Sequence, residues 1–101
     1  MDHYVIKRNG EYALFAPYKI EDALKKGFQS VSAFYDPSVF EKVMQKLSPK
    51  TTWSVEEIQD LIEKELYWAG HFEVMRSFML YRHTRKLQRE HVAGLNEDTT
   101  Y

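Results

Sequence analysis

The sequence contains no cysteine, and this absence removes several kinds of chemistry at once. Disulfides, thiolate nucleophiles, cysteine-ligated zinc fingers and iron–sulfur clusters all require it. No hydrophobic run approaches the roughly 20 residues that span a bilayer, and residues 1–7 lack the apolar segment of a signal peptide. These absences fit the reducing cytosol, so we expect a cytoplasmic protein that does not associate with membranes.

An excess of charge of one sign is also absent. Fourteen basic residues face fifteen acidic ones, giving a formal net charge of −1, so any anion site must be a local concentration of cations. The chain has 101 residues, 44% of them hydrophobic, which predicts one domain with a modest core and little room for a catalytic cleft.

The motifs of familiar enzymes are missing as well. The sequence has no glycine-rich phosphate loop, no nucleophile elbow and no His-Glu-x-x-His motif. The four histidines lie far apart along the chain, so their spacing does not predict a metal site. We therefore expect a chain that is not an enzyme on its own and has no catalytic residues.

Two short alternating segments open the chain, residues 3–7 and 11–15, with Asn9-Gly10 between them. Asn-Gly is the strongest short signal for a two-residue hairpin turn. That turn would pair Tyr4 with Phe15 and Ile6 with Ala13. One face would then carry Val5, Lys7, Tyr12 and Leu14, either as part of the core or as an apolar surface for a flat base.

Four helices are predicted after the hairpin. Apolar residues with helical spacing follow Pro17, and Asp36-Pro37 opens a second helix to about Leu47. Residues 51–53 favour a short third strand, and a capping box at residues 54–57 begins a helix that ends near Gly70. The helix over residues 72–91 is apolar all round in its first half, which predicts a central, buried position. The fold class is α+β and mainly helical: a four-helix bundle capped by a small two- or three-stranded sheet.

The cations are distributed unevenly. Lys7 and Arg8 lie at the end of the hairpin, and Lys19 lies in the first turn of a helix, where the backbone favours anions. Arg82, Arg85, Lys86 and Arg89 form one stripe of the last helix. Several converging cations are what a triphosphate requires. The alternative is a solvated face whose charges pair with nearby glutamates.

Three blocks of this sequence resemble the ATP-cone domain, in the order that the family has them. The blocks are residues 5–10 (VIKRNG) with Phe15 and residues 19–20, then residues 55–63 (VEEIQDLIE), then residues 78–85 (FMLYRHTR). The resemblance spans residues 5–89. It implies an allosteric domain that takes ATP or dATP as its effector, with magnesium as a candidate companion ion. Residues 1–92 would form this regulatory domain, and residues 93–101 would lead toward a catalytic domain.

The resemblance also implies roles for individual residues. It makes Lys7 and Arg8 phosphate or ribose contacts and Lys19 a phosphate contact. The base would lie against Val5 and near the start of the third helix, at Val55 and Gln59, while Arg82 and Arg85 would close the phosphate side. Ala13 and Ala16 depart from the family pattern, which often has an acidic residue and a polar helix cap at these positions.

The family occurs mainly in ribonucleotide reductases, where ATP would activate and dATP would inhibit. The end of the chain resembles the junction into an anaerobic, class III ribonucleoside-triphosphate reductase, whose catalytic domain would be the partner, with self-association through cones as a second contact. Nucleic-acid binding through the basic stripe is not expected, because the net charge is balanced. Two alternatives stay open. One is a ligand-free interaction module with Trp53, Tyr67 and Trp68 exposed; the other is the cone of a transcriptional regulator, whose family carries cysteines that are absent here.

Overall fold

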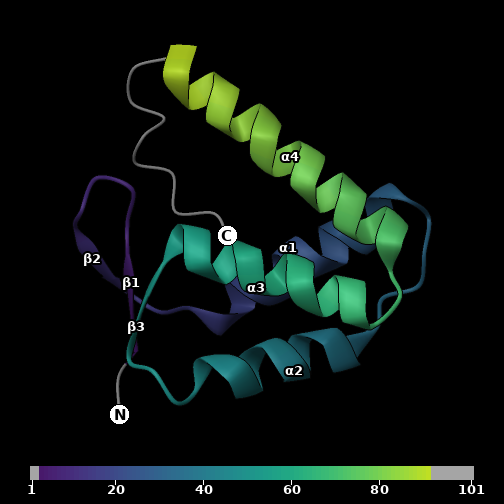
Figure 1. Cartoon of the computed structure of the whole chain (residues 1–101), viewed down its shortest axis with the longest axis horizontal. Helices are drawn as coiled ribbons and strands as arrows, with labels where there is room; N and C mark the ends of the chain where they lie inside the picture. Colours follow the sequence, from purple (N-terminus) through teal and green to yellow (C-terminus); the bar gives the residue numbers. More distant parts are fainter. Residues whose placement is uncertain (1–2, 92–101) are drawn as a thin grey trace.

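The computed structural model describes residues 3–91, which form four helices beside a three-stranded sheet (Figure 1). The elements, in chain order, are β1 (Tyr4–Ile6), β2 (Tyr12–Leu14), α1 (Pro17–Ser30), α2 (Pro37–Leu47), β3 (Thr52–Ser54), α3 (Val55–Trp68) and α4 (Phe72–His91). The predicted α+β, mainly helical architecture is confirmed. The expected linker, residues 93–101, lies outside the described residues.

The sheet has the order β2-β1-β3. β1 pairs with β2 in antiparallel fashion and with β3 in parallel fashion. The predicted third strand is therefore confirmed, shifted by one residue toward the C-terminus. Because β3 leads directly into α3, the sheet fixes the start of α3 beside the hairpin.

The register of the hairpin differs from the prediction by one residue. The observed pairs are Tyr4 with Leu14, Val5 with Ala13 and Ile6 with Tyr12. A shift of one residue moves side chains to the opposite face of a sheet. Val5 is only 1% exposed, whereas Tyr12 and Leu14 are 66% and 67% exposed. The prediction that Val5, Tyr12 and Leu14 share one apolar face is wrong.

The turn explains the shift. The Gly10 amide donates to the Lys7 carbonyl at 2.9 Å, and the Lys7 amide donates to the Glu11 carbonyl at 2.7 Å. Within this turn only Gly10 has a positive φ, of 89°, and the Asn9 side chain accepts from the Glu11 amide at 3.0 Å. A two-residue type I′ turn needs positive φ at both central positions. The loop instead spans residues 8–10, and it brings Arg8 into the turn.

The helices begin where the sequence predicts them. Pro17 occupies the first turn of α1, and Asp36 caps α2 by accepting from the Ser38 amide. At the start of α3, Ser54 and Glu57 form the complete capping box. These caps satisfy backbone amides that have no partner within the helix, and each contributes about 1 kcal/mol.

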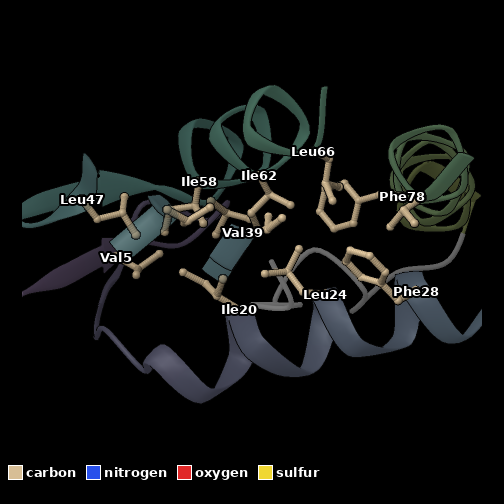
Figure 2. Packing of buried hydrophobic residues seen from close by; sticks show 13 residues of the cluster. Val5, Ile20, Leu24, Phe28, Val39, Leu47, Ile58, Ile62, Leu66 and Phe78 are labelled. Carbon is tan, nitrogen blue, oxygen red and sulfur yellow. The ribbon is translucent and has the colours of Figure 1, made fainter. Parts of the chain in front are cut away.

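The hydrophobic core lies between α3 and α1 and is closed by α2, α4 and Val5 of β1 (Figure 2). Its largest fully buried side chains include Phe28, Leu24, Ile62 and Leu66. Full burial of such a side chain contributes about 1.5–3 kcal/mol through the hydrophobic effect. The core therefore holds the helices in fixed positions around the sheet.

The central helix is α3, and the prediction that α4 is central is wrong. α3 packs against α2 and α4 and adjoins β3, whereas α4 buries only Val74 and Phe78 and lies on the outside (Figure 1). Leu80 is 65% exposed and Met79 is 46% exposed. Apolar residues around a whole helix permit burial without requiring it. No helix within residues 3–91 is both long enough and apolar enough to pass through a lipid bilayer.

Candidate functional site

Two of the predicted phosphate-binding arginines meet at one carboxylate. Arg8 donates from Nε to Oε1 of Glu56 at 3.1 Å, and Arg82 donates to Oε2 of the same residue at 2.6 Å. The guanidinium of Arg8 also donates to Oε1 of Gln59 at 3.3 Å. The hairpin turn, the start of α3 and the middle of α4 thus converge on Glu56.

Arg82 is further held by two other acidic residues of α3. One of its terminal nitrogens lies 2.7 Å from Oδ1 of Asp60 and 2.7 Å from Oε2 of Glu63. Its side chain is 21% exposed, so these contacts are partly shielded from water. Of the two interpretations of the basic stripe, pairing with nearby acids is the one that holds at this position, and the acids come from the neighbouring helix.

The pKa values of this cluster follow from the same contacts. Burial alone would raise the pKa of Glu56, but Arg82 and Arg8 outweigh it and hold the pKa below its usual range. Burial would lower the pKa of Arg82, but Glu56, Glu63 and Asp60 raise it further above its normal value. The Glu56 carboxylate and the Arg82 guanidinium are therefore both charged at neutral pH.

A second feature is a cavity of about 480 Å³ between α1 and α4. Lys19, Asp22 and Lys26 of α1 lie along one side, and Phe78 and Tyr81 of α4 lie along the other. Lys19 and Lys26 are seven residues apart, so they occupy one face of the helix. The cavity therefore combines an apolar wall with cations, and its size falls within the range of small-molecule sites.

The two helices approach closely beside this cavity. A Cβ atom at Gly27 would lie 3.3 Å from Cγ1 of Val74, a tighter contact than most side chains make. The hydroxyls of Ser30 and Ser77 are hydrogen-bonded at 2.7 Å. A small residue at position 27 thus lets α4 pack onto α1 and leaves the cavity open above the contact.

The remaining predicted site residues lie in different surroundings. Nζ of Lys7 is 3.8 Å from Glu11, and Arg85 donates to Gln88 at 3.1 Å. Val5 and Val55 are each 1% exposed and belong to the core, and Gln59 is 4% exposed. The two valines therefore present almost no side-chain surface to a ligand.

Of the three aromatic residues predicted to be exposed, two are exposed and one is not. Tyr67 and Trp68 are 50% and 68% exposed, and Phe72 packs with Tyr67 at a ring distance of 5.6 Å. Trp53 is half-buried, and its indole nitrogen donates to the Leu47 carbonyl at 3.2 Å. The prediction that Trp53 belongs to an exposed patch is wrong.

Sequence reasoning missed the acidic partners and, apart from Lys19, the residues that line the cavity. Glu56, Asp60 and Glu63 recur at helical spacing on one face of α3, which is a readable signal. Nothing local in the sequence pairs that face with the basic stripe, because its acids lie 19 to 26 residues before Arg82. Lys26 belongs to no motif, and the block that contains Tyr81 gave it no role in the site. Only the packing of α1 on α4 brings the two residues together.

The fold and the site define a class of small helical domain with a three-stranded cap. In it, cations of the hairpin and α4 are held by acids of α3, and cations of α1 line a cavity against α4. The sequence model of the ATP cone domain matches residues 3–87. The chain belongs to the ATP-cone family.

Relatives of three kinds share this domain. The chain is 31% identical over 94 residues to the ribonucleoside-diphosphate reductase subunit alpha of Chlamydia pneumoniae, which covers 80% of this chain and 9% of that protein. It is 28% identical over 101 residues to the anaerobic ribonucleoside-triphosphate reductase of Salmonella typhimurium, covering 97% of this chain and 14% of that protein. It is 34% identical over 104 residues to the vitamin B12-dependent ribonucleoside-diphosphate reductase of Thermoplasma acidophilum, covering 93% of this chain and 14% of that protein.

The chain thus spans between 9% and 14% of the length of these relatives. It corresponds in extent to one domain of these relatives. The names of these relatives give different cofactors and substrates. The anaerobic reductase is therefore one of three kinds of reductase that the chain resembles.

Proposed function

We propose that this domain binds ATP or dATP and regulates a ribonucleotide reductase according to which nucleotide is bound. The observation that carries the proposal is the cavity beside Lys19, in a chain that belongs to the ATP-cone family. An ammonium group in the first turn of a helix is suited to a phosphate, because the helix N-terminus also attracts anions. The proposed site residues are Val5, Lys7, Arg8, Lys19, Val55, Gln59, Arg82 and Arg85. Lys19 lines this cavity, and the two valines would act from the core, by packing behind the site.

The effect of the ligand requires two states of the parent enzyme. A nucleotide shifts an equilibrium only as far as its affinities for the two states differ. ATP and dATP differ by one ribose hydroxyl, so the site must distinguish that group or the space it fills. Our proposal is that ATP favours the active arrangement of an anaerobic reductase and dATP the inhibited one, with magnesium accompanying the triphosphate.

Isothermal titration with ATP and with dATP tests the binding step. The unaltered chain should bind both nucleotides, and Lys19→Gln should weaken binding at least tenfold, because it removes a charge next to the phosphates. Lys25→Gln is the matched control, since Lys25 lies on the same helix and pairs with Glu21 at 3.6 Å. It should change the affinity less than about twofold, as expected for an exposed charge.

The comparison of the two variants shows whether binding depends on the position of Lys19 or only on the total charge of the domain. Equal losses in Lys19→Gln and Lys25→Gln would mean that only the overall charge matters. An absence of heat with both nucleotides at millimolar concentration would reject the proposal.

A second candidate function is protein association through the exposed aromatic residues at the junction of α3 and α4. The rings of Tyr67 and Trp68 lie 5.4 Å apart, and Phe72 adjoins them. Exposed aromatic clusters of this kind are enriched at protein interfaces. The partner would be the catalytic domain or a second cone.

Sedimentation of the chain at increasing concentration tests self-association. If the cluster mediates it, Trp68→Ser should shift the chain toward monomer and leave nucleotide affinity unchanged. A chain that stays monomeric with and without nucleotide would leave the catalytic domain as the partner to be assayed.

A further inference from the structure

Glu56 bridges two arginines, and none of the predicted site roles explains this bridge. Its two carboxylate oxygens bind different arginines: Oε1 binds Arg8 of the hairpin turn, and Oε2 binds Arg82 of α4. Its side chain remains 53% exposed, so the carboxylate is not fixed by burial in the core. The exposed carboxylate of Glu56 therefore links the hairpin turn to α4.

The charge around these arginines matters for an incoming anion. Glu56, Asp60 and Glu63 present three carboxylates to two guanidinium groups, so this cluster carries a net negative charge. A phosphate approaching Arg8 meets a guanidinium already bound by Oε1 of Glu56. Like charges repel strongly where water is partly excluded, and the Arg8 side chain is only 13% exposed.

Displacing Glu56 from Arg8 has a consequence for α4. Arg82 is the residue through which α4 is hydrogen-bonded to the acidic face of α3, with contacts of 2.6 and 2.7 Å. The Glu56 carboxylate can move away from Arg8 only by changing its geometry on Arg82. A change at the hairpin is therefore passed to α4 through one side chain.

We propose that Glu56 is an internal competitor for phosphate and a positioning residue that links the nucleotide site to α4. A phosphate bound at Arg8 displaces Oε1 of Glu56, and the released carboxylate alters how Arg82 holds α4 against α3. This inference rests on the proposed function for its ligand, and it names the regulation of that site.

Three matched variants test it, each removing one negative charge from the first two turns of α3. Glu56→Gln alters both arginine contacts, and Asp60→Asn alters the contact with Arg82 alone. Glu57→Gln alters neither, because Glu57 pairs with Lys50 at 2.8 Å and glutamine preserves the capping box. All three side chains are exposed, so the variants should fold.

The readouts are ATP affinity by titration and amide hydrogen exchange of residues 72–91 with and without ATP. Glu56→Gln should bind ATP about fivefold more tightly, the size of a modest coupling between charged groups. In that variant ATP should no longer change the exchange of α4. Glu57→Gln and Asp60→Asn should stay within about twofold of the unaltered affinity.

Three results would overturn the proposal. Equal gains in all three variants would show that the effect is long-range charge, and unchanged or weaker binding by Glu56→Gln would show that Glu56 does not compete. Persistence of the ATP effect on α4 exchange in Glu56→Gln would refute the link.

A measurement without nucleotide distinguishes this inference from the proposed function. The quantity measured is the equilibrium constant of unfolding of Arg8→Gln, Arg82→Gln and the double variant. The effect of the double change should differ by at least about twofold from the product of the two single effects. In the Glu56→Gln background the double effect should equal that product. If the chain binds no nucleotide, the proposed function fails while this cycle still decides the link. Additivity in the original background would overturn the inference whatever the nucleotide result.

Discussion

Removing the hydroxyl of Tyr35 should stabilise the domain. This oxygen is buried and has no hydrogen-bond partner among residues 3–91, while the ring packs edge-on against Phe28 at a centroid distance of 5.8 Å. An unpaired buried polar group costs about 1–3 kcal/mol. Tyr35→Phe keeps the ring contact and removes that cost, so we expect the free energy of unfolding to rise by about 1 kcal/mol and the Tm by about 4 °C.

The assay is thermal and urea denaturation followed by circular dichroism. Tyr67→Phe is the control, because Tyr67 is half exposed and its hydroxyl is accessible to water. That change should stay within about 0.5 kcal/mol. A Tyr35→Phe protein that is less stable than the unaltered chain at pH 7 would show that the hydroxyl has a partner, and the reasoning would be refuted.

The alkaline range gives an independent check on the same group. Burial raises the pKa of Tyr35, and Glu21, Asp36 and Glu41 raise it further. The unfolded chain therefore releases the phenolic proton first as the pH rises past about 10, and this titration lowers the stability of the unaltered protein from that pH upward. Tyr35→Phe lacks the titration, so its advantage should widen above about pH 10. A gap that narrows there would contradict the assigned surroundings.

Three further predictions concern stability and are measured by urea denaturation. The hydrogen bond from His71, followed by that from Ser38, lowers the pKa of Asp36. Its contribution to stability is therefore present above about pH 4 and is lost as the pH falls through the lower folded-state value. Asp36→Asn should cost about 1 kcal/mol at pH 7 and almost nothing once the pH is below that folded-state value. Ser54→Ala should cost about 1 kcal/mol through loss of the capping box, and no change would mean that the box contributes nothing. Leu66→Ala should cost about 2–5 kcal/mol, whereas Leu80→Ala should stay within about 0.5 kcal/mol because Leu80 is 65% exposed; similar losses would argue that α4 is as buried as α3.

The helices were predictable because their signals are local. A cap at Asp36, a proline at position 17 and a capping box at residues 54–57 each determine where a helix begins, whatever the rest of the chain does. The hairpin was only half predictable. The Asn-Gly pair located the turn, but the choice between two and three loop residues depends on one φ angle at Asn9, and that choice set the register.

The position of α4 could not be read from its own composition. Its apolar residues surround the helix, and burial is decided by which neighbours have matching faces. α3 buries Ile62 and Leu66 in the core and places acidic side chains toward α4. α3 therefore lies at the centre, and α4 packs on its outer side. Leu80 is consequently left in water.

The same geometry decides what the basic residues of α4 do. Spacing along one helix cannot show whether Arg82 faces a ligand or an acid, because its acids lie 19 to 26 residues earlier in the chain. Once α3 and α4 pack together, three acids hold Arg82, and Lys19 lies on the wall of the cavity. A phosphate in the cavity lies beside Lys19, whereas a phosphate at Arg82 must first displace those acids. Accordingly, Lys19→Gln should weaken nucleotide binding far more than Arg82→Gln, and the reverse order in titration would mean that the acids of α3 move away from Arg82 when the ligand arrives.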